Sequence, residues 1–151
     1  MDTPASSTLL PIIQLAITPV ILISGVGALM LTLTNRLGRI VDRTRILAGQ
    51  VRQAGPAAAE RAHLVNQLEI LWRRAKLIRQ AVTFAGLSML VACGLVLVIF
   101  INAVLARELA GLGLTLFMTS ILLLIAALVA FLRDIHASLH ALHLEVLKAQ
   151  E

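Results

Sequence analysis

Three uncharged, strongly apolar runs constrain this chain more than any other feature. They cover about residues 9–34, 81–106 and 109–132. A helix of about 20 apolar residues crosses the roughly 30 Å hydrocarbon layer of a bilayer. Charged residues make up 14% of the chain, against about 25% in a soluble domain, and the deficit lies in these runs. The sequence therefore predicts an all-α integral membrane protein with three transmembrane helices.

Lysine and arginine are distributed very unevenly between the segments outside the runs. Residues 35–80 contain ten of them and residues 1–8 contain none. Arg107 lies between the second and third runs, and Arg133 and Lys148 follow the third. Cytoplasmic segments of membrane proteins carry the excess of basic residues. We therefore expect an outside N-terminus, a cytoplasmic segment 35–80 beside the anionic inner leaflet, and a cytoplasmic C-terminus.

The segment 35–80 has the spacing of two helical seams that flank one turn. Gly55 and Pro56 mark the turn, because glycine ends helices and proline starts them. Seam positions recur every three or four residues, as in a coiled coil. They are Leu37, Ile40, Thr44, Leu47, Val51 and Ala54 before the turn, and Leu64, Leu68, Leu71, Ala75, Ile78 and Val82 after it. We expect a cytoplasmic coiled-coil hairpin, a tail helix over residues 133–149, and a single domain over residues 1–151.

Two stretches of the chain carry a family resemblance. The matching residues are Gln14-Leu15, Pro19-Val20, Leu22, Ser24-Gly25, Asn35-Arg36-Leu37 and Arg39-Ile40-Val41-Asp42-Arg43. This pattern resembles a family of small bacterial membrane proteins known only as a domain of unknown function, with an SNRLxRIVDRxR-type motif after the first transmembrane helix. Thr34 stands where serine is expected, and "FLRDIHASLHAL" (131–142) resembles the exit of the family's third span. The resemblance implies a multi-pass protein of the bacterial inner membrane and supplies no activity.

The arginine-rich segment after the first run is one candidate site. Its members are Asn35, Arg36, Arg39, Asp42, Arg43 and Arg45. On a helix, Asp42 lies within three residues of both Arg39 and Arg45, which permits ion pairs. One interpretation is a charge network that orients the helix at the lipid headgroups. The other is a lock between subunits or between hairpin and tail, or a vestibule that attracts ions.

A stripe of small and polar residues follows one face of the first run. It contains Gln14, Thr18, Gly25, Ala28 and Thr32, with Ile21 and Asn35 at the same spacing. Small residues let membrane helices approach closely, and polar ones bond across the contact. The stripe is therefore either a helix-packing face or the lining of a pore on an oligomer axis.

His136, His140 and His143 lie at i, i+4 and i+7 of the predicted tail helix. Histidines one turn apart can bind a transition metal, but no carboxylate or cysteine nearby completes a ligand set, although Glu145 lies in the next turn. We favour a solvated face, with metal binding as a weak candidate and a pH-sensitive contact as another. No cofactor is expected.

The three runs contain no charged residue and no histidine, whereas proton-coupled transporters and redox enzymes need such groups in the membrane. The sequence also lacks a phosphate-binding loop and a nucleophile elbow, so we do not expect an enzyme. Cys93 is the only cysteine, which excludes a disulfide framework within the chain.

Three helices cannot by themselves enclose a substrate path. We therefore expect a homo-oligomeric scaffold or regulator that acts through its cytoplasmic hairpin, with itself and an unknown cytoplasmic protein as partners. The alternative is a homo-oligomeric ion channel lined by the first span. Nucleic acid is not an expected partner, because the basic residues lie beside the membrane runs.

Overall fold

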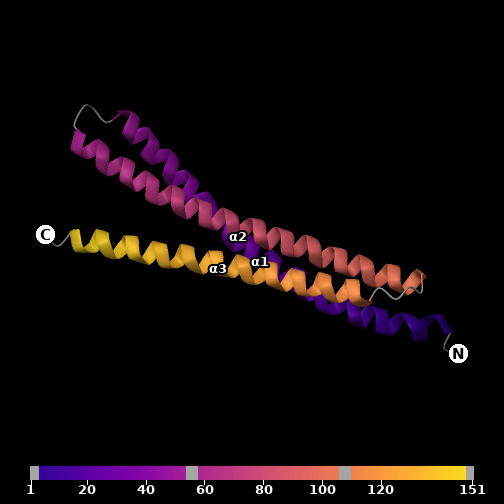
Figure 1. Ribbon diagram of the computed structural model, residues 1–151. Coiled ribbons are helices and arrows are strands. Elements are labelled where there is room, and N and C mark those ends of the chain that lie inside the picture. The colour runs from indigo at the N-terminus through magenta and orange to yellow at the C-terminus, as the bar shows by residue number, and fades with distance from the viewer. Residues whose placement is uncertain (1–3, 54–57, 106–109, 149–151) are drawn as a thin grey trace. The chain divides into compact units, whose positions relative to one another are not determined.

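A computed structural model describes the backbone of residues 4–53, 58–105 and 110–148, and the side chains of most residues from 11 to 138 within them. The described chain is all-α, with α1 at Pro4–Gln53, α2 at Ala58–Leu105 and α3 at Ala110–Lys148 (Figure 1). The predicted turn at Gly55 and Pro56 and the connection between the second and third runs lie outside the described residues.

All three helices are long and apolar enough to cross a membrane, over Ile13–Gln53, Arg61–Leu105 and Ala110–Ser138. Many large side chains within these stretches are exposed, including Leu90, Leu97, Leu114 and Leu122. Such surfaces are stable in hydrocarbon and costly in water. The prediction of an all-α chain with three helices long and apolar enough to span a membrane is confirmed.

Helix α1 passes without interruption from the apolar run into the arginine-rich segment and ends at Gln53. Each residue of a helix bonds to the residue four positions away regardless of side-chain polarity. A change from apolar to charged residues therefore alters the surroundings of the helix without ending it. Helix α2 makes the reverse transition, from the charged segment at Arg61 to the apolar run.

The chain divides into two compact units, each with segments of all three helices. One comprises residues 31–82 and 127–151, and in it the end of α1 runs beside the start of α2 (Figure 1). Its core is a cluster of Ile40, Leu47, Leu71 and Ile78, against which Leu37, Leu64, Leu68, Ala75 and Val82 pack. All nine are seam positions of the sequence pattern. Burying one such leucine or isoleucine contributes about 1.5–3 kcal/mol. This seam therefore holds the end of α1 against the start of α2, the two arms of the hairpin.

The other unit comprises residues 1–30 and 83–126. Its contacts use small side chains, since Ala85, Ser88 and Ala92 on α2 are almost fully buried. Their spacing of three and four residues places them on one face of α2. A Cβ added at Gly113 of α3 would lie 3.7 Å from Leu95, which is ordinary packing distance. Small residues are the usual means by which membrane helices pack closely.

Candidate functional site

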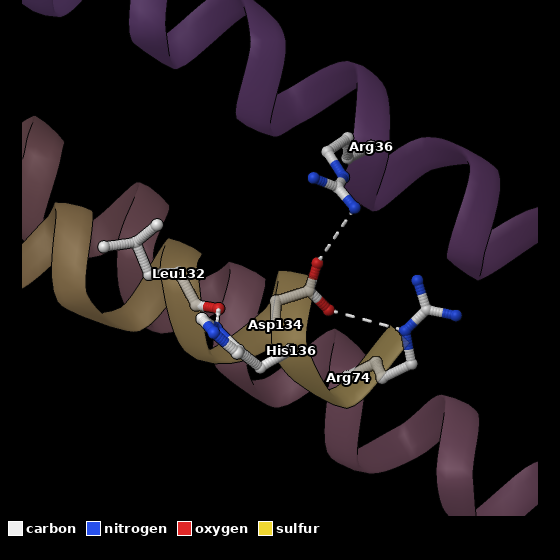
Figure 2. Close-up of polar contacts among 5 residues, drawn as sticks. All are labelled: Arg36, Arg74, Leu132, Asp134 and His136. Atoms are coloured by element: carbon white, nitrogen blue, oxygen red, sulfur yellow. Dashed lines mark hydrogen bonds and ion pairs between the residues drawn. The ribbon is translucent and has the colours of Figure 1, made fainter. Parts of the chain in front are cut away.

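The buried carboxylate of Asp134 links all three helices within the unit formed by residues 31–82 and 127–151. Asp134 lies on α3 and is fully buried. Its Oδ2 lies 3.4 Å from Nη2 of Arg36 on α1, and its Oδ1 accepts a hydrogen bond from Nε of Arg74 on α2 at 3.5 Å (Figure 2). We call these three residues the Asp134 triad.

Both contacts of the triad are longer than the about 2.7–2.9 Å of a tight charge-assisted hydrogen bond. The Oδ2 atom is within ion-pair distance of Arg36, yet it accepts no hydrogen bond from the described residues. The two observations agree if the contact with Arg36 is electrostatic and lacks hydrogen-bond geometry. Each guanidinium thus meets one carboxylate oxygen, and neither forms the two-pronged pair typical of arginine with a carboxylate.

Phe131 adds a second contact between α1 and α3 beside the triad. The Arg36 guanidinium lies over its ring, 5.2 Å from the centroid. Phe131 and Asp134 are three residues apart on α3 and share a face. A cation over an aromatic ring contributes about 0.5–2 kcal/mol. Arg36 therefore meets α3 through both charge and ring, which fixes the side chain in one orientation.

The predicted lock around Asp42 is exposed at nearly every position. Asn35, Arg39, Asp42, Arg43 and Arg45 are all exposed on α1, and Arg36 is half-buried. Within the described residues Asp42 forms no ion pair with Arg39 or Arg45. A lock between subunits through Asp42 stays a prediction.

Asp134 is a residue that the sequence analysis missed. The available signal was the position of the charges relative to the apolar runs. Arg36 closely follows the first run, Arg74 precedes the second, and Asp134 closely follows the third. One acid and two arginines at the same end of three adjacent spans can meet if the helices pack together.

The small and polar stripe of α1 is exposed along its length, although Thr18 also lines a cavity with residues of α2 and α3. Its residues Gln14, Thr18, Gly25, Ala28 and Thr32 are all exposed, as are Ile21 and Asn35. The buried residues among those described in the apolar run of α1 are instead Ala16, Pro19, Val26 and Leu33. A Cβ added at Gly25 would have no heavy atom within 4 Å. Most of the stripe therefore lies outside the buried face of α1.

A partly open apolar cavity of about 500 Å³ lies within the unit formed by residues 1–30 and 83–126. Thr18 and Pro19 of α1, Asn102 of α2 and Phe117 of α3 are among its lining residues. Thr18 and Asn102 give its wall two polar side chains in otherwise apolar surroundings.

The histidine stripe is described only at its first member. Nδ1 of His136 donates a hydrogen bond to the carbonyl oxygen of Leu132 at 2.8 Å (Figure 2). With Nδ1 as the donor, Nε2 of the exposed neutral ring can accept a hydrogen bond or bind a metal ion. No three metal-ligating side chains come together among the described residues. The side chains of His140 and His143 lie outside that part of the chain, so metal binding stays a prediction.

Comparison with known proteins yields one family. A family model described as "Protein of unknown function (DUF2721)" matches residues 16–144. The chain belongs to this family. No curated protein and no solved structure matches the chain.

Membership of the DUF2721 family confirms the resemblance to a domain of unknown function that the sequence suggested. The matched residues contain the whole Asp134 triad and the arginine-rich segment, whereas Gln14 precedes them. The triad and most of the stripe are therefore parts of the DUF2721 region itself.

Proposed function

We propose that the protein is a homo-oligomeric scaffold or regulator of the bacterial inner membrane, assembled through α1 and acting through its cytoplasmic helical hairpin. The observation that carries the proposal is the exposure of the small and polar stripe along the membrane-crossing part of α1. A self-association surface explains why small and polar residues remain exposed on this face of α1.

The energetics of the membrane favour burial of this stripe against another helix. Gln14 and Thr18 expose polar side chains where lipid would surround a monomer, and polar groups in hydrocarbon are costly without partners. Gly25 and Ala28 leave room for a second backbone to approach. One hydrogen bond between membrane helices contributes about 0.6–2 kcal/mol, and repetition along the stripe adds to this. A second copy of α1 is the simplest partner with the same spacing.

The charge distribution supports a cytoplasmic position for the hairpin. The ten basic residues of 35–80 would lie beside the anionic inner leaflet, in agreement with the positive-inside rule. The packed seam of the two arms gives a stiff projection rather than a flexible loop. Its exposed outer faces are available to a second copy or to a cytoplasmic protein.

A homo-oligomeric ion channel lined by α1 is the second candidate, and the same exposed stripe favours it. Gln14, Thr18 and Thr32 would then face water on the oligomer axis. Conductance of the purified protein in liposomes separates the candidates, because a scaffold passes no current.

Assembly through the stripe is tested by adding bulk at its centre. We expect Gly25→Leu to shift the protein toward monomer in native mass spectrometry from detergent, because the new side chain prevents close approach. Val20→Leu adds bulk at an exposed position of α1 outside the stripe and should leave the oligomer unchanged. A monomeric wild-type protein, or equal loss of oligomer in both variants, contradicts the proposal.

A further inference from the structure

We propose that Arg36 and Arg74, held by Asp134, form a binding site for the phosphate group of an anionic phospholipid. This inference concerns a discrete site on each copy of the chain. It requires the three membrane spans but neither the oligomer nor the orientation of the protein. It rests on the hydrogen-bonding capacity of the two arginines, on the local charge, and on the position of the triad along the helices.

The first step is the unused hydrogen-bonding capacity of the arginines. A guanidinium carries five N–H donors, and each here meets Asp134 with a single nitrogen. Figure 2 shows the two terminal nitrogens of Arg74 turned away from the carboxylate. The side chains of Arg36 and Arg74 remain 24% and 21% exposed. Both can therefore reach another acceptor without breaking the triad.

The second step is charge. Residues 34–41, 72–77 and 131–136 surround the triad along the three helices and contain Asp134 as their single acid. Their basic residues are Arg36, Arg39, Arg73, Arg74, Lys76 and Arg133. The triad alone carries two positive charges and one negative charge. This excess of one positive charge matches the single negative charge of a phosphodiester, and arginine binds phosphate oxygens with two parallel hydrogen bonds.

The third step is depth. Arg36 follows the first apolar run by two residues, and Asp134 follows the third by two. Arg74 precedes the second run by seven residues, or about 10 Å along a helix. These short separations place the triad near the headgroup layer, which adds several ångströms on each side of the hydrocarbon. Trp72 is 66% exposed two residues before Arg74, and tryptophan is enriched at this interface.

Asp134 acts as a positioning residue in this site. Two guanidinium groups repel each other, and a buried carboxylate between them removes the repulsion while fixing both side chains. The arginines are then ordered before the lipid arrives, so less side-chain entropy is lost on binding. A preorganised pair distinguishes this site from the exposed arginines of the same segment.

The test compares lipid binding to the full chain by native mass spectrometry with titrated phosphatidylglycerol or zwitterionic phosphatidylcholine. We expect tighter binding of phosphatidylglycerol, and a loss of about tenfold in its affinity in Arg74→Gln. Arg45→Gln removes an exposed arginine of the same segment and should retain the wild-type affinity. Equal affinity for both lipids, or equal loss in both variants, overturns the proposal.

Two further measurements separate a specific site from general attraction and from damage to the fold. Arg74→Lys keeps the positive charge and the pair with Asp134 but loses the planar guanidinium. The variant should therefore fold, but its affinity for phosphatidylglycerol should be several-fold lower than that of the wild type. Full affinity in Arg74→Lys would mean that positive charge alone recognises the lipid. That result would overturn the proposal of a specific arginine site. Displacement of the lipid by millimolar inorganic phosphate would identify free phosphate as the ligand and overturn the lipid assignment.

Discussion

Ser88 of α2 and Ser120 of α3 exchange hydrogen bonds in both directions. The Oγ of Ser88 donates to the carbonyl oxygen of Ser120 at 2.8 Å, and the Oγ of Ser120 donates to that of Ser88 at 3.0 Å. Both residues are fully buried. Each hydroxyl therefore has a partner on the other helix, which satisfies it where neither water nor lipid is available. The pair fixes the register of α2 against α3.

Loss of either hydroxyl should weaken this contact modestly. We expect Ser88→Ala to destabilise the protein by about 0.6–2 kcal/mol, the usual range for hydrogen bonds between membrane helices. Because the two hydroxyls act together, the double variant with Ser120→Ala should cost less than the sum of the singles. Unfolding in mixed detergent measures these values. Thr119→Ala is the control, since Thr119 is exposed and bonds within its own helix, and an equal cost there would contradict the assignment.

Asp134 should matter more for stability than any exposed charge of the chain. Asp134→Leu leaves the partly buried Arg36 and Arg74 facing each other without a counter-charge, and the cost of about 3–5 kcal/mol for breaking a fully buried ion pair is the upper bound of the expected loss. Replacing Arg36 and Arg74 with methionine in the same variant should recover much of this loss, because no unpaired buried charge then remains. Thermal unfolding of the purified protein measures both changes. An unchanged melting temperature in Asp134→Leu would show that the triad contributes nothing to stability.

The difference between what the sequence predicted and what it missed follows from the range of the interactions. Helical spacing is local, so the seam through Ile40, Leu71 and Ile78 could be recognised from neighbouring residues alone. Asp134 meets Arg74 across 60 residues of sequence, and no local pattern connects them. Asp42 has arginines within one turn, which made it the more visible acid, although it is exposed in the folded chain.

The exposure of the α1 stripe could not be predicted from helical spacing either. Spacing placed Gln14, Thr18 and Gly25 on one face, but it did not determine whether that face meets α2 and α3 or lies outside. The burial of Ala16, Val26 and Leu33 shows that another face of α1 packs within the chain. Ala85, Ser88 and Ala92 of α2 are also small residues at helical spacing, as in the stripe. They are buried, whereas the stripe of α1 is exposed.

The seam of the hairpin predicts a sharp contrast between neighbouring leucine and isoleucine residues. Leu71 is buried in the core cluster, whereas Ile70 is 39% exposed. We expect Leu71→Ala to cost about 2–5 kcal/mol through lost burial and a cavity, and Ile70→Ala to cost far less. Hydrogen exchange of the 35–80 amides would report the loosening of the arms. Similar exchange in both variants would mean that the cluster does not hold the hairpin together.

The predicted orientation can be tested with single cysteines. Cys93 is exposed, so it is first replaced by alanine. In that background, cysteine at the exposed Gln50 should react with a membrane-impermeant reagent only from the cytoplasmic side, and cysteine at Ala110 only from outside. The physical basis is the excess of arginine and lysine between residues 35 and 80. Labelling of position 50 in intact cells would show that the orientation is the opposite of the predicted one.

Substitutions of Asp42 and Asp134 should show their effects in different assays. Asp42 is exposed and lacks an ion pair within the described chain, so Asp42→Asn should change the stability of the monomer by less than about 0.5 kcal/mol. If Asp42 pairs with arginines of a neighbouring copy, the same change should lower the oligomer fraction in native mass spectrometry. Asp134→Asn should instead lower the melting temperature through loss of the buried charge.

A normal oligomer with altered conductance in Asp42→Asn would favour the ion vestibule over the lock. Unchanged assembly and unchanged conductance would leave Asp42 as a solvated charge.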